Sequence, residues 1–590
     1  MDDFDKLNFT DKQKELVAEL LSNLSGNQAN WLSKFLVEFA KHAPAEAENS
    51  SAVHNAPLLI VYGSESGNSE NLAQKAFKQA KIKGFKPVVK DMFEIKPQDL
   101  VTAENIFIVI STWGEGDPPE RATEFFKEIL SDSAPEFSAK NKYAILALGD
   151  SSYVEFCGAG KKLDTKLEVQ GAKKILDRKD CDVDFEKPAL AYIEEALNKF
   201  LEVNGVKEVE NKKSAPAASE FDYSMYFGSK EYTPNEPFIA ELKSKVLLNE
   251  AGSEKEVYHI EIDLSGSGIK YEAGDALGVV PENGEQLVDK ILEAVKISDE
   301  AIKNQLKTEY DITALTKPVV ENYLKLAENK KLSEILNSEK FNDYIYGRDI
   351  LDLITEHPIK GITGAQLTSV LRKLPPRLYS IASAKEIVGD EVHLTIGAVR
   401  FNAQSRDKKG VASTFFADSL KNGAKVKIYN KPNKNFRLPK NNDAPVIMVG
   451  PGTGIAPFRS FMQYRDAVGS KGKNWLFFGE QHFLLDFYYQ VEWQDYKERG
   501  LLTNFDAAFS RDKPQKIYVQ NRMYQHKKEL YNWLEQGAYF YVCGDEKRMA
   551  KDVDAMLHKI IAEVSGKGDD AAKEYVAKMK KEQRYLRDVY

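Results

Sequence analysis

A serine-rich turn near residue 66 has the chemistry of a phosphate site. Its residues are Ser64, Glu65, Ser66, Gly67, Asn68 and Ser69. The turn follows the apolar run 58–63 and opens a helical pattern, so hydroxyls and backbone N–H groups at a helix N-terminus can donate to a phosphate. The lysine of a Walker loop is absent, which disfavours a triphosphate. A capped strand–helix turn with ordinary serines accounts for the same residues equally well.

Two further loops follow apolar runs of strand length, and each carries an aromatic residue. Trp113 lies in the loop 111–120, and Tyr153 lies in the loop 148–160. In an open parallel sheet the carboxyl ends of the strands form one crevice, so we expect the three loops to converge. Either aromatic alone is more often a packing residue, but three convergent loops favour a site that holds a flat ring.

The segment 58–203 resembles flavodoxin, and its three loops match the FMN-binding loops of that family. The resemblance implies FMN, with the phosphate bound at residues 64–69. It also implies ring contacts from Ser111, Thr112, Trp113, Gly114, Leu148, Gly149, Asp150, Ser151, Ser152, Tyr153, Val154, Glu155, Phe156 and Cys157.

A second candidate site begins with Arg377, Tyr379 and Ser380 in the stretch PPRLYSIAS. Arginine can bind a pyrophosphate and tyrosine can stack on a ring, although periodicity alone indicates only a plain strand. The run HLTIGAVRF follows, and Gly-Val-Ala-Ser then opens a helix near residue 410.

The order of these motifs resembles ferredoxin–NADP reductases and diflavin reductases, which implies FAD. Phe401 stands where close relatives have a tyrosine, so we leave it out of the site. The implied FAD contacts are Arg377, Leu378, Tyr379, Ser380, Thr395, Ile396, Gly397, Gly410, Val411, Ala412 and Ser413, with weaker matches at Thr313 and Gly347.

Glycines and a basic loop indicate a nucleotide site in the last third of the chain. The glycines of 450–454 lie between an apolar strand and a helical pattern, which lets the backbone approach a pyrophosphate. Ser510, Arg511 and Lys516 place a hydroxyl and two cations in one loop. This set suits the 2′-phosphate of NADPH, and a solvated surface loop is the alternative.

The resemblance to NADPH-dependent reductases extends this site and adds a catalytic group. A buried free cysteine such as Cys543 is usually an inert small hydrophobe. The resemblance instead places it with Ser380 and Asp588 beside the nicotinamide, where they position C4 against the flavin. It also places Tyr590 on the face of the FAD ring. The implied NADPH contacts are Ser510, Arg511, Lys516, Ile517, Tyr518, Val519, Gln520 and Asp552.

The elements that position these sites indicate a multidomain α/β protein. The resemblances imply a flavodoxin-like doubly wound domain, an FAD-binding β-barrel with a helical connecting insert, and an NADP-binding Rossmann-like domain. Amphipathic spacing predicts two helices in 1–45, for oligomerisation or partner binding, because so short a segment cannot bury a core. The other predicted boundaries are 57–203 for the FMN domain, 204–234 for a linker, 235–440 for the FAD domain with its insert at about 284–372, and 441–590 for the NADP(H) domain.

Composition excludes several other classes of protein. A net charge of −8 argues against nucleic-acid binding, and no apolar run is long enough to span a membrane. The three cysteines are far apart, which disfavours a disulfide framework, a zinc site or a cysteine-ligated iron–sulfur cluster; we predict no metal site. The acidic start lacks the features of a signal peptide, so we expect a cytoplasmic protein.

Three stretches, RYLRDVY, KNWLFFGEQHF and MAKDVDAML, resemble the flavoprotein subunits of NADPH-dependent assimilatory sulfite reductases. The resemblance implies electron flow from NADPH to FAD to FMN, and then to a siroheme and iron–sulfur hemoprotein subunit. Such a chain supports sulfite reduction to sulfide in cysteine biosynthesis, and a homo-oligomer through the N-terminal segment is expected. A general soluble diflavin reductase for a cytochrome is the alternative, and a redox-dead flavin-binding scaffold is a rival from another class.

Overall fold

In the computed structural model, residue contacts divide the chain into two units, and Ala56–Phe200 with Tyr232–Tyr590 form the one described here. Apart from residues 32, 33 and 36, the N-terminal helices predicted for 1–45 lie outside the described residues, as does most of the predicted linker 204–234. Among the described residues, no helix is both long and apolar enough to cross a membrane. The structure describes residues 32, 33, 36, 56–114, 116–153, 155–205, 232–327 and 329–590.

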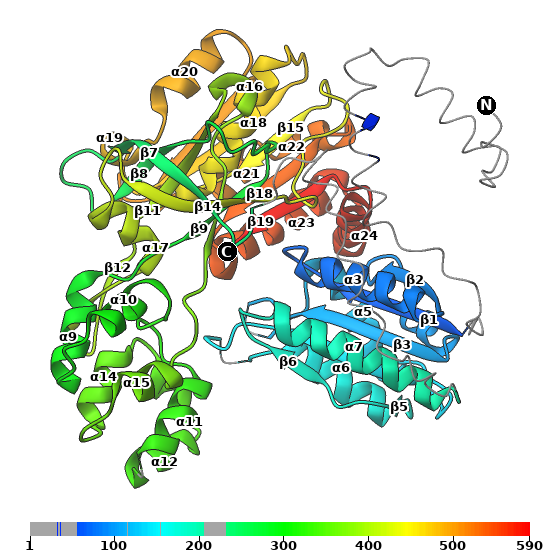
Figure 1. Ribbon diagram of the computed structural model, residues 1–590. Helices are drawn as coiled ribbons and strands as arrows, with labels where there is room; N and C mark the ends of the chain where they lie inside the picture. Colours follow the sequence, from blue (N-terminus) through cyan, green and yellow to red (C-terminus); the bar gives the residue numbers. More distant parts are fainter. Residues whose placement is uncertain are drawn as a thin grey trace. The chain divides into compact units, whose positions relative to one another are not determined.

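The first domain is built on a parallel sheet in the order β2-β1-β3-β4-β5, with β6 paired to β4 (Figure 1). The central strand β3 is apolar from Ile106 to Ile110, as expected for a strand that helices cover on both faces. Ile108 packs with Phe125 of α5, whereas Phe107 contacts Tyr192 of α7. The elements are β1 (Pro57–Gly63), α3 (Asn68–Ile82), β2 (Lys86–Asp91), α4 (Pro97–Val101), β3 (Asn105–Ser111), η2 (Glu120–Ala122), α5 (Thr123–Leu130), β4 (Lys142–Leu148), α6 (Gly158–Val169), β5 (Lys173–Lys174), β6 (Lys179–Cys181) and α7 (Glu186–Val203).

The second domain is an antiparallel sheet in the order β10-β9-β14-β7-β8-β11. A bridge between Ile381, just after β10, and Leu394 of β11 joins the two edge strands, which closes the sheet into the predicted barrel. Its elements are β7 (Phe238–Leu247), β8 (Val257–Asp263), β9 (Ala276–Val280), β10 (Arg377–Ser380), α16 (Lys385–Val388), β11 (Glu391–Gly397), the hairpin strands β12 (Arg400–Ala403) and β13 (Arg406–Lys409), α17 (Val411–Thr414), η3 (Phe415–Ser419) and β14 (Lys425–Lys431).

A helical insert with its own hydrophobic core separates β9 from β10, as the helical pattern predicts. Leucine, isoleucine and valine side chains from successive short helices meet in this core. The helices are α9 (Glu285–Val295), α10 (Glu300–Thr308), α11 (Lys317–Leu326), α12 (Lys330–Leu336), α13 (Phe341–Ile345), α14 (Ile350–Glu356) and α15 (Gly364–Val370).

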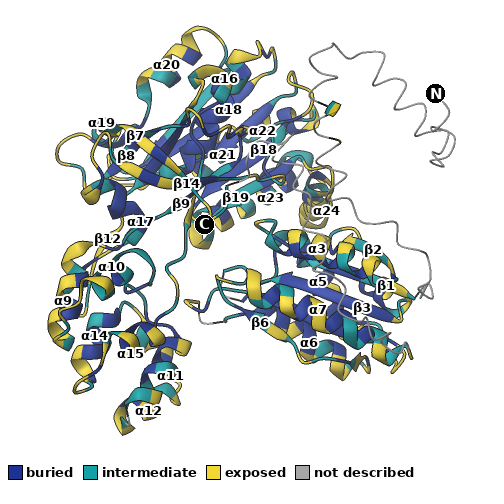
Figure 2. Cartoon of the chain, in the orientation of Figure 1, coloured by how far each residue is buried: buried dark blue, intermediate teal, exposed yellow. Residues whose placement is uncertain are grey.

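The third domain is a parallel sheet in the order β17-β16-β15-β18-β19. Its central strands β15, β16 and β18 are buried, while the outer faces of helices such as α20 and α24 are exposed (Figure 2). Its elements are β15 (Val446–Val449), η4 (Gly452–Ile455), α18 (Ala456–Ala467), β16 (Asn474–Glu480), α19 (Phe483–Asp486), α20 (Gln490–Glu498), β17 (Asn504–Phe509), α21 (Val519–Gln525), α22 (Lys527–Glu535), β18 (Tyr539–Gly544), η5 (Glu546–Ala550), α23 (Lys551–Ser565), α24 (Gly568–Lys581) and β19 (Tyr585–Val589).

The segment that sequence patterning shows only as extended, 585–589, is the edge strand β19 of this sheet. It pairs in parallel with β18, and Asp588 lies beside Cys543 in the register.

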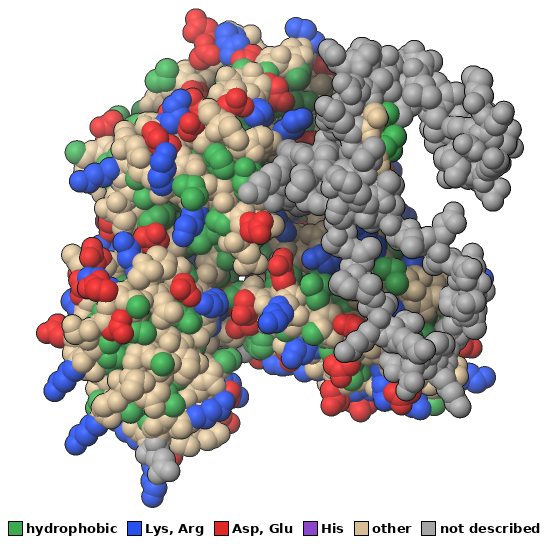
Figure 3. Space-filling view, in the orientation of Figure 1, with side chains coloured by type: hydrophobic (Ala, Val, Ile, Leu, Met, Phe, Trp, Pro, Cys, Tyr) green, Lys and Arg blue, Asp and Glu red, His purple; other side chains and the backbone are tan. Residues whose placement is uncertain are grey.

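On the face drawn in Figure 3, acidic and basic side chains are interspersed, so the net charge of −8 does not form a single acidic region there. The predicted α/β multidomain fold is therefore confirmed.

Candidate active site and cofactor sites

The serine-rich turn lies between β1 and α3, where the sheet presents its carboxyl edge. Ser64 and Ser69 are buried, and their Oγ atoms have no hydrogen-bond partner among the described residues. Gly67 caps the helix with a φ of 79°, a left-handed conformation that favours glycine. Buried hydroxyls rarely stay unpaired, so two of them beside a helix N-terminus fit a hydrogen-bond acceptor such as a phosphate.

Glu65 differs from its neighbours because its side chain faces another loop. Its carboxylate accepts the backbone N–H of Glu120 at 2.9 Å, from the end of the loop 111–120. Burial, with the nearby charge of Glu120 adding to it, raises the pKa of Glu65 to about 7. A contact between Glu65 and a phosphate would therefore come from its backbone, which sequence alone did not show.

Backbone contacts bring the second and third loops together. The N–H of Thr112 donates to the carbonyl of Leu148 at 2.9 Å, and the Thr112 hydroxyl accepts from Ala159 N–H at 3.2 Å. Trp113 is held by paired backbone bonds to Asp117, at 2.8 and 2.9 Å. The predicted convergence of the loops is thus present, while their contacts with a ring stay a prediction.

Some side chains of the 148–157 loop already have protein partners. Ser151 hydrogen-bonds Asp182, and Ser152 donates to Asp150 at 2.7 Å. Arg372 donates from Nη1 to Asp150 at 2.6 Å. These polar groups hold the loop in shape, which leaves the exposed ring of Tyr153 as its free aromatic surface. The predicted contact Val154 lies outside the described residues.

The residues predicted to bind FAD are gathered around β10, the end of β11 and the start of α17. Thr395 and Thr313 turn their hydroxyls to protein atoms: Thr395 bonds Tyr489 at 2.7 Å, and Thr313 donates to Asp311 at 2.9 Å. Arg377 and Leu378 are exposed on β10. Other predicted contacts can offer only backbone to a cofactor, because their side chains are buried in cores; these are Leu148, Cys157, Ile396, Ala412 and Val519.

The glycine-rich turn after β15 allows two close approaches. A Cβ on Gly454 would come within 2.1 Å of the carbonyl oxygen of Cys543, so this glycine lets η4 pack on β18. Gly452 has a φ of 58°, and a Cβ there would meet only Glu480, at 3.7 Å. Gly454 therefore serves packing, whereas Gly452 lies on the open side where a pyrophosphate could approach.

The predicted 2′-phosphate loop follows β17, and its cations are exposed. Arg511 forms an ion pair with Glu254, a partner that sequence patterning does not predict. Lys516 is exposed, and Tyr518 is 45% exposed. Ser510 donates to the Glu480 carbonyl at 3.3 Å. The predicted contacts Gln520 and Asp552 bond each other at 3.2 Å. Arg511 and Lys516 can therefore bind an anion, which must compete with the carboxylate of Glu254 for Arg511.

Three predicted catalytic residues meet although they come from three strands. The Ser380 hydroxyl on β10 donates to Asp588 on β19 at 2.6 Å, and the Cys543 thiol on β18 lies 3.8 Å from the same oxygen. Burial raises the pKa of the Asp588 carboxyl and also that of the Cys543 thiol. The cysteine is therefore a neutral donor, and the group can orient a ring and balance charge.

Tyr590 lies next to this cluster with its ring half exposed. Its hydroxyl bonds Thr453 at 2.8 Å, and its N–H donates to the Gly544 carbonyl at 3.1 Å. The ring is 49% exposed, so one face remains open to a planar ligand. Thr453, between Gly452 and Gly454, is not predicted from the sequence, because the motif is recognised by the spacing of its glycines alone.

Arg587 is a second residue that sequence patterning missed. Its guanidinium donates to Glu120 at 2.7 Å, and Lys580 pairs with the same carboxylate at 3.1 Å. Successive strand residues point to opposite faces, so Arg587 and Asp588 face different neighbours. This arrangement ties the loop 111–120 to β19, the strand that carries Asp588.

One group of described side chains has metal-ligand types, namely His259, Glu261 and His393. Its polar atoms are engaged: His259 bonds Tyr489 at 3.0 Å, and Arg459 donates to His393 at 3.3 Å. Burial and the Arg459 charge lower the pKa of both imidazoles to about 4, so they are neutral. The positive charge of the Arg459 guanidinium disfavours a metal cation among these side chains. The group instead forms a polar contact between the barrel and helix α18.

Family models match three parts of the chain. They are described as flavodoxin over residues 60–197, as an FAD binding domain over 230–319 and 301–415, and as an oxidoreductase NAD-binding domain over 448–555. The chain is thus an oxidoreductase whose three domains bind FMN, FAD and NADPH.

Curated relatives match almost the whole chain. A sulfite reductase [NADPH] flavoprotein alpha-component of Bacillus subtilis is 43% identical over 606 residues, covering 99% of this chain and 98% of the relative. The protein of the same name from Vibrio cholerae is 38% identical, covering 98% of this chain and 96% of its own. A further one from Cronobacter sakazakii is 39% identical over 95% of each chain.

Proposed function

Because the chain belongs to the family of sulfite reductase [NADPH] flavoprotein alpha-components, we propose that it carries electrons from NADPH to a hemoprotein that reduces sulfite to sulfide. The cluster of Ser380, Asp588 and Cys543 is the observation that supports this most directly. It combines a strand of the FAD barrel with two strands of the nucleotide sheet, where a nicotinamide must meet a flavin.

When bound, the cofactors would supply the redox chemistry, namely hydride transfer from NADPH to FAD and single-electron transfer through FMN to the acceptor. The protein's residues bind and orient. Asp588, held by the Ser380 hydroxyl, places a buried negative group where positive charge develops on the nicotinamide. The Cys543 thiol keeps its proton and packs against the same oxygen. Arg511 and Lys516 bind the 2′-phosphate, which NADH lacks.

The acceptor is proposed to be a siroheme and iron–sulfur hemoprotein subunit. The proposal includes the cofactor-contact residues and the domain boundaries predicted from the sequence. It also includes a cytoplasmic location and self-association through residues 1–45. The N-terminal segment lies outside the described residues, so its support comes from sequence patterning alone.

The test of this function uses the full-length chain with and without the hemoprotein. NADPH should reduce ferricyanide with the chain alone, and sulfide should form from sulfite only when both proteins are present. Efficient reduction of a cytochrome, with no sulfide formed with the hemoprotein, would instead support a general diflavin reductase.

Removing the partner of Arg511 should improve the use of NADPH. Glu254 competes with the 2′-phosphate for this guanidinium, and an exposed ion pair contributes about 0–1 kcal/mol. Glu254→Gln should therefore lower the KM for NADPH by roughly 2- to 5-fold, at about 1.4 kcal/mol per decade. Steady-state ferricyanide reduction measures it, and the KM for NADH should not change. An unchanged or higher KM for NADPH would contradict the role of Arg511.

A further inference from the structure

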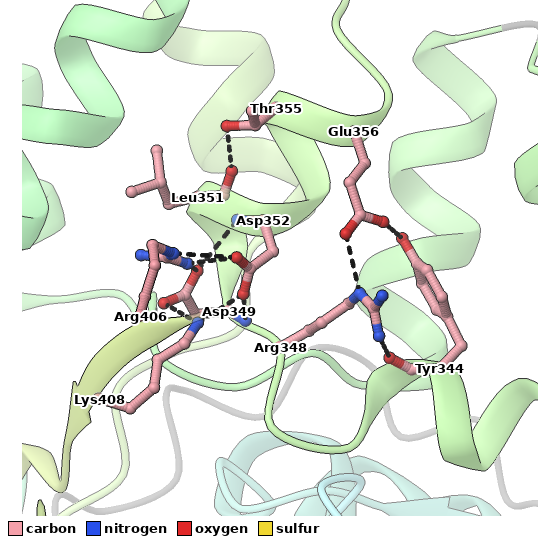
Figure 4. Close-up of polar contacts among 9 residues, drawn as sticks. All are labelled: Tyr344, Arg348, Asp349, Leu351, Asp352, Thr355, Glu356, Arg406 and Lys408. Carbon is pink, nitrogen blue, oxygen red and sulfur yellow. Dashed lines mark hydrogen bonds and ion pairs between the residues drawn. The ribbon is translucent and has the colours of Figure 1, made fainter. Parts of the chain in front are cut away.

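Three buried charged side chains and one partly exposed arginine join the helical insert to the hairpin β12–β13 of the barrel. Asp349 and Asp352 lie at the start of α14, and Arg406 and Lys408 lie on β13 (Figure 4). Asp349, Asp352 and Lys408 are 2%, 7% and 7% exposed. Two acids face two bases, so this four-charge cluster is neutral as a whole.

Each base of the four-charge cluster contacts both acids. Lys408 Nζ donates to Asp349 Oδ2 at 2.7 Å and to Asp352 Oδ2 at 2.5 Å. Arg406 Nη2 donates to Asp349 Oδ1 at 2.6 Å and to Asp352 Oδ1 at 2.5 Å. Burial acts to raise the pKa of Asp352, but the hydrogen bonds, from Lys408 first, outweigh it and hold that pKa below its usual value.

The backbone fixes the positions of all four groups. Arg406 and Lys408 are two residues apart on a strand, so their side chains leave on the same face. Asp349 is the N-cap of α14: its N–H donates to Asp352 Oδ2 at 2.9 Å, and the N–H of Asp352 donates to Asp349 Oδ1 at 3.0 Å. The helix start thus presents the acids as one unit, and the strand presents the bases as another.

The hairpin has a turn that its own sequence supports poorly. Gln404 and Ser405, between the two strands, have φ values of 53° and 57°. Two successive left-handed residues are typical of a type I′ turn, which favours asparagine and glycine. Next to it, a Cβ on Gly347 would come within 2.9 Å of Ala403 Cβ, so the insert backbone packs directly on the hairpin. External contacts with the insert therefore hold a turn that local propensity does not.

The hairpin leads directly into the segment 410–413, which the FAD-binding family match includes. Gly410 N–H donates to Val399 O at 2.9 Å, and Val399 N–H donates to Ser413 Oγ at 3.1 Å. A Cβ on Gly410 would lie 2.9 Å from Val399 Cβ. A displacement of the hairpin should therefore displace residues 410–413 as well, because this segment is hydrogen-bonded to Val399 and packs closely against it.

We propose that Asp349, Asp352, Arg406 and Lys408 are positioning residues for FAD: through the hairpin, they hold 410–413 where the cofactor contacts it. The insert therefore sets the FAD affinity of the barrel through four residues that are not among the predicted FAD contacts. This inference rests on the proposed function only in assigning FAD contacts to 410–413.

The test compares FAD and FMN binding in the full-length protein. Lys408→Met leaves two buried acids with one base, and we expect FAD affinity to fall by about 10-fold or more. Apoprotein titrated with FAD, and the flavin content of purified protein, measure it, with FMN binding as the internal reference. Lys408→Met with Asp352→Asn restores a neutral cluster and should recover FAD affinity to within about 3-fold. A purely structural role would lower the Tm and leave FAD affinity unchanged.

A matched control lies in the same insert. Arg348 pairs with Glu356 at 3.1 Å, away from the hairpin (Figure 4). Glu356→Gln should keep wild-type FAD affinity, since an exposed pair contributes little. If Lys408→Met does not fold, Arg406→Lys, which keeps the charge but loses the forked contact, should still weaken FAD by about 3-fold. Wild-type affinity in the variants of the four-charge cluster, or an equal loss in Glu356→Gln, would overturn this inference. A wild-type chain that holds no FAD would instead overturn the proposed function.

Discussion

Ser69→Glu is expected to abolish FMN binding and sulfite reduction while NADPH-driven ferricyanide reduction continues. Ser69 is fully buried at the start of α3, and its hydroxyl has no partner among the described residues. A glutamate would place a negative charge and extra volume where the phosphate is proposed to bind, against the preference of that helix end. Ferricyanide can draw electrons from FAD, so the loss should be confined to reactions that need FMN.

The measurement is the ratio of FMN to FAD released from purified protein, together with both activities. Ser69→Ala is the milder companion, because it removes the hydroxyl without adding charge. A hydrogen bond to a charged group contributes about 1.5–3 kcal/mol, so FMN affinity should fall by about 10- to 100-fold in that variant. Full FMN content in Ser69→Glu would show that the phosphate lies elsewhere, and sulfite reduction without FMN would show that the electron order is wrong.

Asp588→Asn should slow flavin reduction by NADPH by about 100-fold, in the range found when one preorganised charge-stabilising group is removed. The amide keeps the shape of the side chain but loses the charge that Ser380 and Cys543 face. Coenzyme affinity should change little, because the 2′-phosphate loop is a separate part of the site. Stopped-flow flavin reduction over a range of NADPH concentrations separates the two quantities.

The pH profile gives this prediction a second readout. Burial raises the pKa of Asp588, so the wild-type carboxylate takes up a proton as the pH falls through that raised value, and flavin reduction should slow. Asp588→Asn should lack this acidic limb. The hydroxyl of Tyr585, which lies on β19 like Asp588, donates to Asp554 Oδ1 at 2.9 Å. Asp554→Asn removes this carboxylate and is the control for the placement of β19. An unchanged rate in Asp588→Asn, or an equal loss in Asp554→Asn, would contradict a direct role for the charge.

The sequence was sufficient where function follows from local pattern. The buried strands β1, β3 and β4 are apolar runs, and the turn 64–69 has donors at a helix start, so both were visible without a structure. The three-domain order and the insert were predictable for the same reason, and the comparisons confirm the family that the motifs resemble.

What the sequence could not show depends on contacts between distant residues. Arg587 meets Glu120, and Arg511 meets Glu254, through tertiary packing that leaves no local spacing to recognise. Thr395 is predicted as an FAD contact, but its hydroxyl bonds Tyr489, a partner far away in the sequence. The edge strand β19 was visible only as an extended segment, since its pairing with β18 is a property of the assembled sheet.

The insert between β9 and β10 has a consequence for how the protein folds in time. Val279 of β9 lies opposite Arg377 of β10, so two strands separated by the whole insert must pair. Loop closure costs entropy that grows with the length of the intervening chain. Asn283 donates to the Tyr310 carbonyl at 2.7 Å, and Tyr310 forms a bridge with Lys373, so the folded insert holds its own entry and exit together. An insert that folds first turns a long-range pairing into a local one, and its folding rate then limits how fast the barrel closes after synthesis.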